Sequence, residues 1–200
     1  MKTFPPEHIG EAVNNKGYRW FENDREDYNL NIVGIRSYNR RANEFDDTMT
    51  ISWKYRGVWK SLAYPCTTDP GQYWLSRLMN PRGCAILVPG QYLNTYALDL
   101  HNDRYEALCQ RLGPVKVYRD KNRNIILDMD PTTITSGRYG INIHHGEYRG
   151  ITEKVGIHSA GCQVFQRFDD FVRAREVWRA ARDSFGNSFT YTLLEEKDFS

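Results

Sequence analysis

The 200-residue sequence predicts a mainly β domain, a β-rich sandwich or open barrel, with one substantial helix near the C-terminus. Short runs of β-branched and aromatic residues recur between positions 28 and 165, and turns rich in glycine, proline or asparagine separate them. One long segment, residues 168–187, instead places apolar residues at helical steps of three and four. The length favours a single domain, which we assign to residues 28–200.

The segment before this domain, residues 1–27, is expected to be a loose lead-in or arm. It contains Pro5-Pro6, Asn14-Asn15 and the charged run ENDRED, which is typical of a solvated face. No apolar segment of a secretory signal follows Lys2, so no leader is expected. No stretch of the chain approaches the roughly 18 apolar residues that a membrane helix requires, so no membrane span is expected either.

The strands are predicted from β-branched runs and from alternation of apolar and polar residues. A strand is expected over 30–35, and the alternation of Met49, Ile51, Trp53 and Tyr55 predicts a hairpin that turns at Arg56-Gly57. The same patterns predict further strands over 84–92 with a break at Pro89-Gly90, 94–101, 115–120, 125–130, 138–145 and 188–196. Short helical turns are expected over 72–78 and 104–112.

The predicted long helix follows a motif rich in histidine and glycine. Asp169 or Asp170 can cap its start, and Gly186-Asn187 can end it. The residues expected on its buried face are Phe168, Phe171, Val172, Arg175, Trp178 and Ala181.

The composition excludes some classes of function. A net charge of +2 with scattered arginines gives no electrostatic case for a nucleic-acid partner.

The sequence DKNRN spaces Asp120, Asn122 and Asn124 like the start of a calcium loop, but Ile125 stands where glycine is required and Pro131 where glutamate is required. We therefore expect a tight polar turn there.

The cysteines are expected to be free thiols. Their spacing includes no C-x-x-C pair, and a chain of this length needs no disulfide for stability. The four cysteines are Cys66, Cys84, Cys109 and Cys162.

The segment GINIHHGEYRGITEKVGIHSAGCQVF, residues 140–165, holds three of the five histidines and one cysteine. It permits three interpretations. Cys162 is a nucleophile that follows a glycine turn, with His144, 18 positions upstream, as its base. Alternatively, His158 and Cys162 bind zinc together with His144 or His145. The third interpretation is a buried structural thiol beside unrelated histidines, which is common in protein cores.

The order of these residues resembles the catalytic domain of the L,D-transpeptidase family. That family carries a strand ending in an I-x-I-H-G-like run, then a loop, then S-H-G-C and an apolar strand. Here INIHHG matches the first part and SAGCQV matches the second, and TTDPG and ILVPGQY match earlier parts weakly.

The resemblance implies a role for each residue of the motif. Cys162 is the nucleophile that accepts the acyl group, and His144 is the general base. The backbone carbonyl of His145 orients the His144 ring, and Ser159 shapes the loop around the thiol. The backbone amides of Gly161 and Cys162 donate to the oxyanion.

The chain departs from the family pattern at two places. Ala160 replaces the usual histidine, and Gln163-Val164 replaces an apolar–arginine pair that often helps hold a substrate carboxylate. His158 is expected to be a neighbour of the site without an assigned task. The candidate carboxylate-binding residues are Arg138, Arg149 and Arg167.

The function implied by the resemblance is acyl transfer on peptidoglycan stem peptides, with no cofactor and no metal. The thiolate attacks the carbonyl of a diamino acid and expels the terminal D-residue, and an amine then accepts the acyl group. If water accepts it, the enzyme is an L,D-carboxypeptidase or endopeptidase.

Without a visible leader, a phage-type lysis protein, a virion enzyme or an injected effector acting on the cell wall is expected. Ordinary pKa values for a cysteine–histidine pair predict activity that varies between about pH 5 and 9.

Two alternatives of other classes stay open. One is a non-catalytic module that binds the cell wall or serves as a structural part of a virion. The other is a zinc hydrolase built on the histidines and Cys162.

Overall fold

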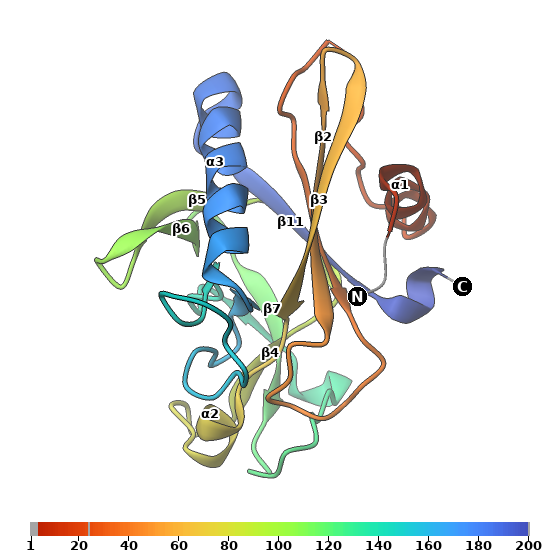
Figure 1. Ribbon diagram of the computed structural model, residues 1–200. Coiled ribbons are helices and arrows are strands. Elements are labelled where there is room, and N and C mark those ends of the chain that lie inside the picture. The colour runs from red at the N-terminus through yellow and green to blue at the C-terminus, as the bar shows by residue number, and fades with distance from the viewer. Residues whose placement is uncertain (1–3, 24, 200) are drawn as a thin grey trace.

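A computed structural model describes residues 4–23 and 25–199, and it is mainly β, as predicted (Figure 1). Eight strands form a closed barrel in the order β1-β11-β5-β6-β9-β10-β3-β2. The barrel strands are β1 (Asn31–Arg36), β2 (Asp47–Tyr55), β3 (Val58–Thr67), β5 (Gly90–His101), β6 (Tyr105–Gln110), β9 (Ile143–His145), β10 (Gln163–Phe165) and β11 (Phe189–Glu195). The expected open barrel or sandwich is thus a closed barrel, and closure leaves no unpaired edge in this sheet.

The barrel closes because the first and last strands pair in parallel. Ile32 lies opposite Tyr191, and Ile35 lies opposite Leu194. All six residues of β1 are buried, since one face of the strand meets the barrel core and the other meets the N-terminal helix α1.

Helix α1 (Pro6–Asn15) lies within the segment expected to be a loose lead-in. Its Ile9 and Val13 pack with Val33, Ile35 and Leu194 in a separate apolar cluster on the outside of the barrel. Helix α1 is therefore docked on the barrel by apolar burial, a contact that its charged and proline-rich flanks gave no reason to predict.

Two tight hairpins turn through pairs of residues with positive φ. At the predicted β2–β3 turn, Arg56 and Gly57 have φ of 52° and 73°, the left-handed geometry of a type I′ turn. Asn102 and Asp103, with φ of 50° and 56°, form the same kind of turn between β5 and β6. The helical turns predicted over 104–112 were wrong, because pairing with β5 buries this segment as a strand.

The predicted strand over 125–130 is also wrong apart from an isolated bridge between Arg41 and Ile126. The preceding turn is polar and tight, as expected, since the Asp120, Asn122 and Asn124 side chains each accept a bond from the backbone amide two residues later.

Helix α3 (Phe168–Phe185) confirms the predicted long helix and packs against β5, β9 and β10 (Figure 1). Phe171, Trp178 and Ala181 are buried as expected, while Ala174 occupies the inner face in place of Val172 and Arg175. Neither aspartate caps the start, because Arg167 is the N-cap and forms no side-chain cap. Gly186 ends the helix with φ of 90°.

A smaller sheet with the order β4-β7-β8 lies beside the barrel, together with the short helix α2 (Gln72–Ser76). Its strands are β4 (Cys84–Leu87), β7 (Val115–Asp120) and β8 (Thr135–Gly137). Two 3₁₀ turns, Pro131–Thr133 and Glu196–Phe199, complete the elements. None of the helices described is long and apolar enough to cross a membrane.

Candidate active site

His144 lies in β9, and Cys162 immediately precedes β10, the adjacent parallel strand of the barrel. Residues of β9 and β10 pair so that His144 lies opposite Val164, and the amide of Gln163 donates to the carbonyl of Asn142. Extending this ladder by one residue sets Cys162 beside Asn142, two positions from His144. Side chains two apart on neighbouring strands share a face, so the thiol and the imidazole point to the same side.

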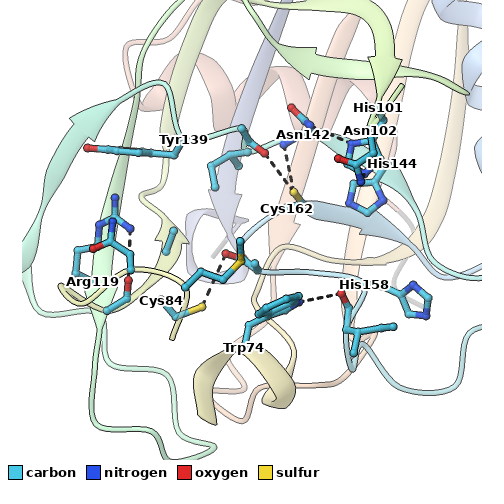
Figure 2. A pocket seen from close by; sticks show the side chains of 18 of the residues that line it. Trp74, Cys84, His101, Asn102, Arg119, Tyr139, Asn142, His144, His158 and Cys162 are labelled. Carbon is cyan, nitrogen blue, oxygen red and sulfur yellow. Dashed lines mark hydrogen bonds between the residues drawn. The ribbon is translucent and has the colours of Figure 1, made fainter. Parts of the chain in front are cut away.

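Both side chains line one cavity of about 560 Å³ between the barrel and the small sheet (Figure 2). The cavity is also lined by residues that are distant in the chain, including His101, Asn142, Arg119, Tyr139, Trp74 and Cys84. The predicted proximity of cysteine and histidine is therefore present in the fold.

The loop before Cys162 is held by Ser159, which is fully buried. Its hydroxyl donates to the carbonyl oxygen of Cys162 at 2.8 Å and accepts from the amide of Gly161 at 3.1 Å. Its carbonyl accepts from the amide of Gly71 at 2.8 Å. Ser159 thus closes a tight turn around the thiol, in line with the role expected of it.

The same contacts change the expected oxyanion site. The amide of Gly161 is engaged by Ser159 and cannot also donate to an oxyanion without breaking that bond. No partner for the Cys162 amide is found in the described part of the chain, so this amide is the available donor. Of the two amides expected from the sequence to donate to the oxyanion, only that of Cys162 is not already engaged.

Gly161 is required by geometry at this turn. Its φ of +124° is outside the range of other residues, and a Cβ atom there would lie 2.5 Å from the carbonyl oxygen of Ala85. We expect Gly161→Ala to lower the free energy of unfolding by at least about 2 kcal/mol, measured by urea denaturation.

Gly150→Ala is the matched control for that variant. Gly150 also has a positive φ, +69°, but open space surrounds its Cβ position. Gly150→Ala should lower the free energy of unfolding by about 1 kcal/mol, which is the cost of the backbone geometry alone. Equal losses for the two variants would show that the contact with Ala85 is unimportant.

The His144 ring is oriented by its own strand. Nδ1 lies 2.8 Å from the carbonyl oxygen of His145, so Nδ1 carries the proton and donates it there. Nε2 is then the basic nitrogen of the neutral ring. This is the orienting contact that the sequence resemblance implied.

The thiol does not donate to His144 in this structure. Cys162 Sγ donates to the carbonyl oxygen of Gly140 and accepts from the amide of Asn142, each at 3.4 Å. A general-base step thus requires the thiol proton to turn from Gly140 toward His144, and catalytic hydrogen bonds often tighten only when substrate binds.

His101 and Asn142 support the histidine, and sequence reasoning did not find them. The His101 ring stacks on His144 with 4.2 Å between centroids and 20° between planes. Asn142 Oδ1 accepts from the amide of Gln110, which leaves its Nδ2 to donate to His101 Nδ1 at 3.0 Å. The position of Asn142 in the alternating run INIHH was the available signal, since it shares a face with His144.

His145 lies on the opposite face, as the strand period predicts. Its ring is surrounded by Tyr105, Tyr148, Phe168 and Phe171, with centroid distances from 4.3 to 4.9 Å. Its contribution to the site is therefore the backbone carbonyl.

Burial keeps both reacting groups uncharged at neutral pH. It lowers the pKa of His144 to about 3, with the His101 ring as a further cause. It also raises the pKa of the Cys162 thiol to about 11. Burial lowers the pKa of His101 to about 4, so the stacked rings do not repel each other as cations. Both pKa shifts favour the uncharged forms of the two groups, a neutral thiol and a neutral imidazole.

The raised pKa of the thiol predicts how its alkylation depends on pH. Only the thiolate is alkylated, and below pH 11 its fraction falls about tenfold per pH unit. Alkylation of Cys162 by iodoacetamide, followed by peptide mass spectrometry, should therefore rise about tenfold per unit from about pH 7 to about pH 10. A plateau between about pH 6 and 8 would instead reveal a thiolate stabilised by an imidazolium.

The predicted carboxylate-binding arginines lie elsewhere. All are exposed, and none lines the cavity: Arg138, Arg149 and Arg167. Arg138 donates to the carbonyl of Leu112, and Arg167 faces Asp170. The arginines that do line the cavity are Arg111 and Arg119.

The remaining histidine and cysteines have simple surroundings. His158 lines the cavity, and its Nε2 lies 3.1 Å from Glu147. All four cysteines are free, as predicted, and Cys84 contacts the carbonyl of Ala160 from the cavity wall. Across the described ranges, no group of three or more histidine, cysteine, aspartate or glutamate side chains is arranged to hold a metal ion.

Comparisons with known proteins found no family model, no curated protein and no solved structure that matches this chain.

Proposed function

We propose that the protein is a cysteine acyltransferase or peptidase of the L,D-transpeptidase type that acts on peptidoglycan stem peptides. The observation that carries this proposal is that Cys162 and His144 line the same cavity, with His144 Nδ1 bonded to the carbonyl of His145. The order of strand, histidine, loop and cysteine in the sequence supports the choice of substrate.

In the proposed first step, Cys162 Sγ attacks a peptide carbonyl while its proton passes to His144 Nε2. The amide of Cys162 donates to the oxyanion that forms. The carbon–nitrogen bond then breaks, His144 returns the proton to the leaving amine, and a thioester remains on Cys162.

In the second step, an amine or a water attacks the thioester carbonyl. His144 accepts its proton, the carbon–sulfur bond breaks, and Sγ regains the proton. The neutral imidazole is free to accept a proton near neutral pH, but its low pKa makes it a weak base toward a thiol of pKa about 11. The proton transfer therefore requires the bound substrate to stabilise the charged pair. Tyr139 and Trp74 provide apolar faces beside the thiol for the rest of the peptide.

Incubation with a carbapenem tests the proposal. The thiol opens the β-lactam ring without loss of atoms, so the mass of the intact protein should rise by the mass of one whole carbapenem. Peptide mapping should place the adduct at Cys162. Binding of stem peptides with neither adduct nor turnover would instead favour the non-catalytic wall-binding module, and turnover abolished by a chelator would favour a zinc hydrolase.

A further inference from the structure

Arg119 is a buried cation at the wall of the cavity. Only 6% of its surface is exposed, and it lies near the C-terminal end of β7 in the small sheet. Its Nε donates to Thr135 Oγ1 at 3.1 Å, and Nη1 approaches the carbonyl of Gly83 at 3.4 Å. The Tyr139 ring lies 4.4 Å from Cζ. These contacts fix the guanidinium but leave Nη2 without a hydrogen-bond partner.

No acid within the described ranges forms an ion pair with Arg119. The other deeply buried arginine, Arg36, lies 3.0 Å from Asp69. Asp120, the neighbour of Arg119 in the chain, is occupied by the amides of Asn122 and Asp128. A buried guanidinium without a counter-ion is costly, and a carboxylate that accepts two parallel bonds is the ligand that best offsets this cost.

Arg119 and the histidines lie on different sides of the thiol. Figure 2 shows Arg119 and Tyr139 on one side of Cys162, with His101 and His144 on the other. In the proposed reaction His144 protonates the leaving amine, so the leaving group occupies the histidine side. The acyl part of the substrate then extends toward Arg119.

We infer that Arg119 binds a carboxylate on the acyl part of the substrate. Nη2 is shielded from water by its surroundings, so the ligand must displace a neighbour to reach it. Tyr139 is that neighbour, because it covers the guanidinium and is itself partly exposed at the cavity. The direction of the acyl part rests on the proposed function, whereas the binding of a carboxylate at Arg119 does not.

Two carboxylates of a stem peptide lie on the acyl side: that on the side chain of the diamino residue, and that of the preceding γ-linked glutamate. The test uses three peptides that are identical except for these groups: both free, the first amidated, or the second amidated. Their Kd values are measured by calorimetry on Cys162→Ala, which cannot turn them over, and kcat/KM is measured on the wild type.

One amidated peptide should bind about 10- to 100-fold more weakly than the free peptide, and its identity names the carboxylate. The ratio of the Kd of this amidated peptide to the Kd of the free peptide should fall to near one in the double variant Cys162→Ala/Arg119→Gln. It should recover in part when Arg119→Lys replaces Arg119→Gln. Because each ratio is taken within one protein, partial unfolding of a variant cancels. Arg123→Gln, which removes the same charge from the exposed turn after β7, should keep the full ratio.

Equal Kd values for all three peptides, or a ratio that survives Arg119→Gln, would overturn the inference. If the Kd values differ as expected but the wild type turns over no peptide, the proposed acyl transfer is wrong and the carboxylate site is still supported. If the wild type turns over all three peptides with equal Kd and kcat/KM, the carboxylate site is wrong and the acyl transfer is still supported.

Discussion

Cys162→Ala should lose the carbapenem adduct completely and lower kcat/KM on stem peptides at least about 1,000-fold. Sγ is the atom that bonds to the acyl carbon in the proposed step, so the variant cannot form the thioester at this position. The turn around it is held by the Ser159 hydroxyl and by backbone groups, so removal of the sulfur should leave the loop in place. Intact-protein mass and product chromatography measure the two effects.

Cys84→Ala is the matched control for that variant. Cys84 lines the same cavity, but its sulfur donates to the carbonyl of Ala160, and burial raises its pKa to about 12. Cys84→Ala should still form the carbapenem adduct and keep kcat/KM within a few-fold of the wild type. An adduct that persists in Cys162→Ala and disappears in Cys84→Ala would reassign the nucleophile.

His144→Gln should lower kcat/KM by about 100- to 10,000-fold, the range found for loss of a general base. The thiol pKa of about 11 makes the loss severe, because little thiolate exists at neutral pH without a base to take the proton. The rate that remains should rise with pH, since hydroxide then supplies the thiolate. Carbapenem acylation rates from about pH 6 to about pH 9 measure both effects.

His158→Gln is the control for His144→Gln, because it removes another histidine from the cavity but not the proposed general base. His158 is oriented toward Glu147 at 3.1 Å and has no contact with His144 or the thiol among the bonds observed. We expect a change of less than about threefold. If the two variants lose activity equally, His144 is not the base.

Much of the fold followed from local pattern. The β2–β3 hairpin, the strand over 115–120 and the helix Phe168–Phe185 were predictable, because alternation, turn residues and helical spacing are all properties of consecutive residues. The segment 104–112 was mispredicted as helical for the complementary reason. Its strand is stabilised by pairing with β5, and a hairpin partner is not visible in the spacing of its own apolar residues.

The candidate site divides in the same way. Cys162, His144, Ser159 and the carbonyl of His145 could be proposed from one continuous motif, and the structure brings these groups together. The arginines chosen from the sequence do not line the cavity, because which arginine reaches it depends on the packing of the small sheet against the barrel.

By itself, the sequence determined a mainly β chain, free cysteines, and a histidine and a cysteine 18 positions apart with glycine turns between them. The tertiary structure decided which groups surround them. It stacks His101 from β5 on His144, buries Arg119 from β7 at the cavity wall, and engages the amide of Gly161. It also decided their protonation, because desolvation acts on a side chain through all the atoms packed around it, wherever they lie in the chain.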